Sequence, residues 1–155
     1  MLNNQLTDFS LDPEKNGKPV ANAPGPRKRP RSSMSPTFVF DANGNLQMVI
    51  GSPGGSSIIG YVAKTVIGVL DWNLTLQDAI NLPNMTARSP VVSAETSRLG
   101  PDVAATLTAR GWNLRPTTTE ASGLHGVRIT PQGLQGGADP RREGVARSTG
   151  AAPSR

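Results

Sequence analysis

Five consecutive pieces of sequence set the architecture: TFVF (37–40), DANGN (41–45), LQMVI (46–50), GSPGGSS (51–57) and IIGYVAKTVIGVL (58–70). An Asn-Gly pair between two apolar runs is the strongest short-range signal for a β-hairpin. The second run passes directly into the glycine-rich piece. The apolar piece that follows predicts a helix buried against a sheet, because its apolar residues cover more than one helical face.

Weaker signals surround this centre. Breaker pairs predict a loop over residues 11–30. Four further elements are expected: a short helix from the capping pair Thr75/Asp78 to Pro83, a helix over 100–111, a strand over 112–115, and a hairpin over 127–130 and 134–138. Hairpins mixed with separate helices predict a layered α+β fold rather than regular βαβ units.

Composition limits the classes of function. The 155 residues contain no Cys and a single His, His125. Disulfide frameworks, thiolate nucleophiles and multi-His metal sites are therefore excluded, and we expect neither a metal nor another cofactor. His125 has no candidate catalytic partner nearby in the sequence, so we expect it at the surface or at a strand edge.

The net charge of +5 is concentrated in residues 27–31 and 141–155. Two local basic spots with few aromatics between them argue against a nucleic-acid reader. The most apolar run, 58–70, is too short for a membrane span, which needs about 20 residues.

The glycine-rich piece between strand and helix is the first candidate site. Glycines let the backbone turn sharply and approach a ligand closely. The helix that follows presents unpaired N–H groups, which bind anions or stabilise an oxyanion during acyl transfer. The piece lacks the Gly-Lys-Ser/Thr ending of a Walker A loop. On pattern alone, a tight turn that binds nothing is equally compatible.

Two pairs of polar residues are further candidates. Gln5 and Asp8, three residues apart, can together hold an ammonium group, or Asp8 can simply cap a turn. Ser32 and Ser33, just before the first strand of the hairpin, can donate hydrogen bonds to a carboxylate or form a solvated turn. No nucleophile with an adjacent base is visible in the sequence.

Three segments in this order resemble the gamma-glutamyltransferase family: LNNQLTDFS (2–10), KRPRSSMSPT (28–37) and GSPGGS (51–56). ADPRR (138–142) with Gly144 is similar to the C-terminal segment of that family. The resemblance implies a four-layer αββα fold of the N-terminal-nucleophile hydrolases, incomplete in this chain. Residues 1–140 would form part of the small-subunit domain, and 141–155 a flexible basic tail.

The resemblance also implies an activity and its residues. That family transfers gamma-glutamyl groups from glutathione-like donors to water, amino acids or peptides, after self-cleavage that exposes a nucleophilic Thr. The resemblance implies that Asp8 and Gln5 bind the α-ammonium group of the substrate, and that Ser32 and Ser33 bind its α-carboxylate. It also implies that the backbone N–H groups of Gly54 and Gly55 stabilise the oxyanion. The Thr is expected upstream of Met1, so this chain alone is expected to be inactive.

The implied partners are the missing N-terminal part of the small subunit and the large subunit. Location in the periplasm or outside the cell follows from the family only, because no signal peptide is recognisable at Met1. Two alternatives remain open: the glutaryl or cephalosporin acylase branch of the same family, and a non-enzymatic fragment that binds through its basic loop at 27–31.

Overall fold

The computed structural model describes residues 3–117, 122–147 and 149. The chain divides into two compact units, Met1–Ser33 and Met34–Arg155, whereas the sequence predicted one domain to residue 140. No helix in the described part of the chain is both long enough and apolar enough to cross a membrane.

The first unit is built from short elements. It contains the 3₁₀ helix η1 (Gln5–Asp8) and the antiparallel pair β1 (Glu14–Lys15) and β2 (Lys18–Pro19). Asn16 and Gly17 both have positive φ, at 54° and 69°, as the turn of a two-residue hairpin requires. The predicted loop over 11–30 therefore holds a small hairpin. The basic side chains of 27–31 are exposed.

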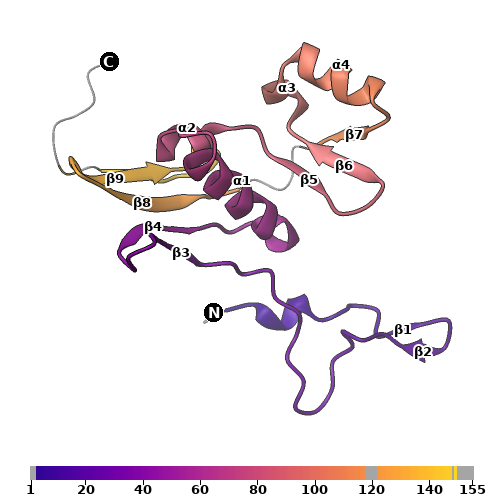
Figure 1. Ribbon diagram of the computed structural model, residues 1–155. Helices are drawn as coiled ribbons and strands as arrows, with labels where there is room; N and C mark the ends of the chain where they lie inside the picture. Colours follow the sequence, from indigo (N-terminus) through magenta and orange to yellow (C-terminus); the bar gives the residue numbers. More distant parts are fainter. Residues whose placement is uncertain (1–2, 118–121, 148, 150–155) are drawn as a thin grey trace. The chain divides into compact units, whose positions relative to one another are not determined.

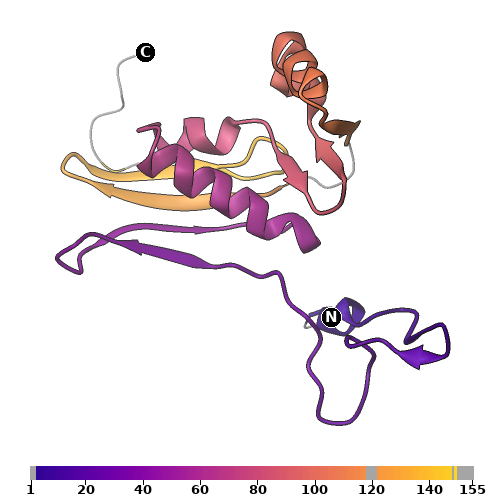
Figure 2. The same cartoon turned by 45° about the vertical axis from the view of Figure 1, so that its right-hand side comes forward.

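The second unit is centred on an antiparallel sheet of strand order β3-β4-β8-β9. Its strands are β3 (Thr37–Phe40), β4 (Leu46–Gly51), β8 (His125–Thr130) and β9 (Gly133–Ala138). The helices α1 (Ile58–Leu70) and α2 (Leu76–Asn81) cover one face of this sheet (Figures 1 and 2). Both predicted hairpins and both of these helices are confirmed.

The hydrophobic core lies between the sheet and the two helices. It comprises Met48, Ile50, Ile58, Tyr61, Val62, Val69, Leu76, Ala79, Ile80 and Leu124. The predicted burial of α1 against a sheet is confirmed, but not all of its apolar residues are buried: Ile59, Ile67 and Leu70 are 57%, 42% and 53% exposed. They lie on the helix face turned away from the sheet.

We call the opposite face of the sheet the uncovered face, because no helix of the described residues packs on it. Phe38 pairs with Val49 and Val49 with Val127, so the three residues share this face. Phe38 is 60% exposed and Val127 40%. The exposed apolar side chains of the sheet strands are Phe38, Phe40, Val127, Ile129 and Leu134.

A second, three-stranded sheet completes this unit. Its order is β5-β6-β7, with β5 (Met85–Ala87) antiparallel to β6 (Val91–Ala94) and β6 parallel to β7 (Asn113–Pro116). The helices α3 (Thr96–Leu99) and α4 (Pro101–Ala109) connect β6 to β7. The sequence predicted α4 and β7, but not α3 or the β5–β6 hairpin.

Candidate functional site

The glycine-rich loop lies between β4 and α1 in the second unit. The backbone leaves β4 at Gly51, passes through Gly54, and enters a 3₁₀ turn, η2 (Gly55–Ser57), that leads into α1. Gly54 has φ 132° and Gly55 φ 54°. L side chains rarely adopt these conformations, so the path of this loop depends on glycine at both positions.

The loop presents two consecutive backbone donors. The carbonyls of Gly54 and Gly55 accept the N–H groups of Ser57 and Ile58, which starts the helix. The N–H groups of Gly54 and Gly55 themselves find no acceptor within residues 3–117, 122–147 and 149. Two neighbouring N–H donors just before a helix can stabilise an oxyanion when both point at it.

The loop is anchored to the segment that precedes β8. The hydroxyl of Ser52 donates to the carbonyl oxygen of Pro53 at 2.7 Å and accepts the N–H of Gly123 at 3.2 Å. No local sequence signal predicts this contact, because Ser52 and Gly123 are 71 positions apart along the chain.

In the first unit, η1 carries Gln5 and Asp8 at its two ends. Asp8 is exposed and Gln5 is half-buried. The side chain of Asn22 donates to the carbonyl oxygen of Asp8 at 2.7 Å and accepts the N–H of Arg31 at 2.9 Å. One amide thus ties the Asp8 end of η1 to the residue just before Ser32.

The two serines lie directly after this tie. Ser32 is exposed and Ser33 half-buried. The structure therefore brings the backbone at Asp8 and the start of the serine pair to one side chain, Asn22, which sequence reasoning missed. Gly54 and Gly55 belong to the other unit.

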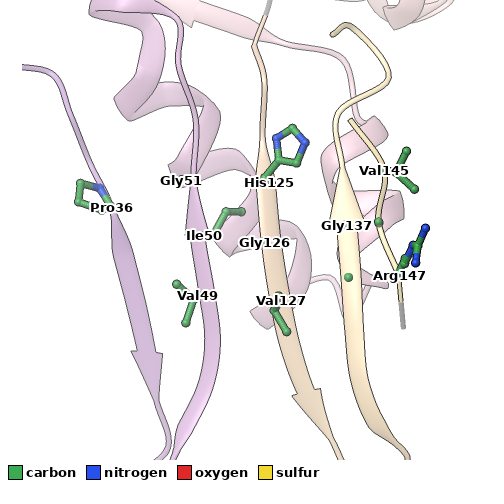
Figure 3. A pocket seen from close by; sticks show the side chains of 12 residues that line it. Pro36, Val49, Ile50, Gly51, His125, Gly126, Val127, Gly137, Val145 and Arg147 are labelled. Carbon is green, nitrogen blue, oxygen red and sulfur yellow. The ribbon is translucent and has the colours of Figure 1, made fainter. Parts of the chain in front are cut away.

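His125 begins β8 and is exposed, as predicted. Its Nδ1 lies 2.9 Å from the carbonyl oxygen of Gly123. The ring borders a shallow pocket of about 480 Å³ on the uncovered sheet face (Figure 3). Val49, Val127 and Val145 also line this pocket, so its wall is mainly apolar.

A buried ion-pair network fixes the end of β9. The guanidinium of Arg141 donates two hydrogen bonds of 2.6 Å to Glu95 and one of 3.1 Å to Asp139. It also donates to the carbonyl oxygens of Ile80 at 3.3 Å and Leu82 at 3.0 Å. Its side chain is only 6% exposed. The packed part of the unit therefore reaches at least Arg141, although the flexible tail was expected to begin there.

Asp139 continues the network toward the glycine-rich loop. Its carboxylate accepts the N–H of Leu124 at 3.1 Å and the hydroxyl of Ser122. Asn84 donates to Ser122 at 2.8 Å. Burial alone would raise the pKa of Asp139, but these hydrogen bonds and those from Arg141 outweigh it and lower the pKa. These contacts give the charged turn at 139–142 a structural role.

The same network lowers the pKa values of Glu95 and Lys64 for different reasons. Burial raises the pKa of Glu95, but hydrogen bonds from Arg141 and from the Asn84 N–H lower it further than burial raises it. Lys64 donates to the carbonyl of Leu82 at 2.8 Å and to Asn84 at 3.0 Å. Burial and the nearby Arg141 lower the pKa of Lys64 to about 8. Among the described residues, no three His, Asp or Glu side chains lie together as metal ligands.

A family model of gamma-glutamyltranspeptidase matches residues 1–149. The chain belongs to the gamma-glutamyltranspeptidase family. The resemblance inferred from the three ordered segments is therefore confirmed, and so is the α+β fold class as part of an N-terminal-nucleophile hydrolase fold.

Individual relatives agree with this membership. The chain is 38% identical to a glutathione hydrolase proenzyme of Escherichia coli, over 91% of this chain and 25% of the relative. An acylase ACY 1 proenzyme of a Pseudomonas species is 30% identical over 94% of this chain and 25% of the relative. The chain thus spans about a quarter of the length of these relatives.

A solved structure shows how far the fold agrees. A gamma-glutamyltranspeptidase inhibited by acivicin superposes with a TM-score of 0.80 at 32% identity. The superposition covers 92% of this chain and 81% of that one. The matched segment of this gamma-glutamyltranspeptidase family member therefore keeps the family's backbone arrangement.

Proposed function

We propose that this chain supplies the substrate-binding and oxyanion-stabilising part of a gamma-glutamyltransferase or glutathione hydrolase. The complete enzyme moves a gamma-glutamyl group from glutathione-like donors to water, amino acids or peptides. The observation that carries this proposal is the pair of backbone N–H groups at Gly54 and Gly55. Both residues have positive φ, and neither N–H group has an acceptor in the described part of the chain. Family membership makes the gamma carbonyl of a gamma-glutamyl group the matching electrophile.

The zwitterionic end of the substrate requires different groups. Asp8, with Gln5, pairs with the α-ammonium, since an exposed carboxylate provides the opposite charge. The hydroxyls of Ser32 and Ser33 donate to the α-carboxylate. The contacts of Asn22 support these two roles, because one side chain binds the backbone of both Asp8 and Arg31, the residue before Ser32. The carboxylate and the two hydroxyls therefore come from neighbouring segments.

The nucleophile comes from the part of the enzyme that this chain does not include. The chain spans about a quarter of its relatives, and its sequence shows no nucleophile beside a base. The N-terminal Thr exposed by self-cleavage attacks the gamma carbonyl, and the large subunit completes the site. We therefore expect the chain alone to be inactive and the whole enzyme to be periplasmic or secreted.

Substrates with and without the α-ammonium test this proposal. The completed enzyme is defined here as the E. coli relative with its matching segment replaced by this chain, after self-cleavage. Gamma-glutamyl and glutaryl anilides differ in the ammonium group only. Asp8→Asn should lower kcat/KM about 10- to 100-fold for the gamma-glutamyl substrate, the range expected when a charged hydrogen bond is lost.

The glutaryl substrate should be almost unaffected by Asp8→Asn, because it has no ammonium for the carboxylate to bind. Asp12→Asn is the matched control, since Asp12 is also an exposed carboxylate of the first unit and accepts the Glu14 N–H in a local turn. Equal losses on both substrates, or no loss on either, would contradict the role of Asp8.

The acylase branch remains a second candidate, because the ACY 1 acylase proenzyme is 30% identical over almost the whole chain. The same pair of substrates separates the two readings. A gamma-glutamyltransferase prefers the gamma-glutamyl anilide, and Asp8→Asn removes that preference. An acylase of this branch prefers the glutaryl anilide before any substitution.

A further inference from the structure

The hydroxyl of Ser52 occupies a particular place beside the glycine-rich loop. It donates to the carbonyl oxygen of Pro53 at 2.7 Å and accepts the N–H of Gly123 at 3.2 Å. The Pro53 carbonyl belongs to the same peptide group as the N–H of Gly54. The contact therefore acts on one of the two donors of the proposed oxyanion site.

A peptide group is planar, and in the trans form its C=O and N–H point in opposite directions. A hydroxyl that holds the oxygen of Pro53 on one side thus turns the N–H of Gly54 to the other side. We propose that Ser52 is a positioning residue that aims the Gly54 N–H at the developing oxyanion, an inference that rests on the proposed function of the loop. Ser52 itself does not contact the substrate.

The segment at Gly123 gives this hydroxyl a fixed support. On either side of Gly123, Ser122 and Leu124 both donate to the carboxylate of Asp139. A side chain at Gly123 would lie 2.7 Å from Cγ of Pro53, so the two segments pack without space between them. Gly123 therefore presents its N–H to Ser52 from a backbone that the buried Asp139 holds in place.

This support matters because the glycines make the loop free to turn. A peptide group flanked by glycine rotates with little steric resistance. Oxyanion stabilisation depends on donors that already point at the oxygen before charge develops. The chain from Asp139 through Gly123 to Ser52 supplies that orientation without occupying the N–H of Gly54.

The test compares three serine variants in the completed enzyme with a gamma-glutamyl anilide. Ser52→Ala removes the hydroxyl, and Ser52→Thr keeps it. Ser89→Ala is the matched control, because the Ser89 hydroxyl also bridges a backbone carbonyl and N–H, both of Val91, in an exposed turn outside the site. Unfolding temperature and the extent of self-cleavage are measured for each variant.

Ser52→Ala should lower kcat about 10- to 100-fold, less than the about 10²–10³ lost with a whole oxyanion donor. KM should change by less than about twofold, because an interaction made only in the transition state acts on kcat. Ser52→Thr should restore kcat, and Ser89→Ala should leave it unchanged. Crystal structures of the enzyme should show the Pro53 carbonyl turned in Ser52→Ala and unturned in Ser52→Thr.

Several results would overturn the inference. They are an unchanged kcat in Ser52→Ala, a loss confined to KM, an equal loss in Ser52→Thr, or a reduced kcat with an unmoved Pro53 carbonyl. Failure of the proposed function looks different: the self-cleaved, unsubstituted enzyme then releases no anilide at all. An active enzyme that is insensitive to Ser52→Ala removes the role of Ser52 alone.

Discussion

Replacing Arg141 with methionine removes a buried cation and leaves its two carboxylate partners in place. The Arg141 side chain is 6% exposed, that of Glu95 15% and that of Asp139 0%. Methionine fills much of the same space but donates no hydrogen bond. The variant therefore leaves two carboxylates facing an apolar side chain.

The size of the effect follows from this burial. Removing one partner of a buried ion pair costs about 3–5 kcal/mol, because the remaining charge loses its compensation. Arg141 makes hydrogen bonds to both carboxylates and to two carbonyls, so the upper part of that range applies. For a chain of this size, a loss of about 4–5 kcal/mol lowers the melting temperature by roughly 8–20 °C.

The assay is urea unfolding of the chain at pH 7, followed by far-ultraviolet circular dichroism. Arg88→Met is the control, since Arg88 lies exposed after β5 and surface substitutions usually stay within about 0.5 kcal/mol. Adding Glu95→Gln to Arg141→Met should recover part of the loss, because one of the two uncompensated charges is then gone.

The pH dependence provides an independent check. In the unsubstituted chain, hydrogen bonds hold the pKa values of Glu95 and Asp139 below their ordinary values. In Arg141→Met, the hydrogen bonds from Arg141 that lower these two pKa values are gone. Burial still raises them, so the pKa values of Glu95 and Asp139 rise. The difference in stability should therefore shrink as the pH falls below about 4, where carboxylates protonate. A loss under 1 kcal/mol at pH 7, or one no larger than in Arg88→Met, would refute the reasoning.

Three smaller predictions also concern the second unit. Thr75→Ala should cost about 1 kcal/mol in urea unfolding, because the hydroxyl caps the start of α2; an unchanged midpoint would contradict this. Gly137→Ala should lower the free energy of unfolding by about 1–3 kcal/mol through overpacking, since the added Cβ would lie 2.7 Å from Cδ1 of Ile80. A variant that is more stable than the unsubstituted chain would contradict this. For the unsubstituted chain, the lowered pKa values of Glu95 and Asp139 predict stability that is present above about pH 4 and lost as the pH falls through the folded-state values; a urea midpoint unchanged from pH 6 to pH 3 would speak against it.

Local sequence signals predicted the central elements well. Asn43-Gly44 between two apolar runs predicted the β3–β4 hairpin, and in its turn Gly44 has a positive φ of 83°. Thr75 caps α2 through its own hydroxyl, a contact within one helical turn. The β5–β6 hairpin was missed because its strands are short and Pro90 lies between them, directly before β6. A proline within an apolar run argues against a strand.

Contacts between distant residues could not be predicted in the same way. The pairing of Glu95 with Arg141 spans 46 positions, and nothing near either residue specifies the other. Asn22 was overlooked for a similar reason, because an asparagine in a loop usually bonds to its own neighbours. The site residues themselves came from the order of three motifs, whereas Ser52, their support, is visible only in three dimensions.

The exposure of α1 shows a different limit. Apolar residues on more than one face of the helix predicted burial against a sheet, and the face toward the sheet is buried. Within the described residues, the outer face of the helix has no second layer to pack against. Its outward residues, such as Ile59, and the uncovered sheet face at Phe38 are both exposed. Burial cannot be predicted from the pattern when other layers of a fold lie outside the sequence considered.

The most direct test of the central claim is turnover of a gamma-glutamyl anilide by two samples side by side. One sample is the 155-residue chain alone, and the other is the completed, self-cleaved enzyme that contains it. The account predicts no release of aniline by the chain and steady turnover by the completed enzyme. Turnover by the chain alone, or a completed enzyme that is self-cleaved but inactive, would contradict it.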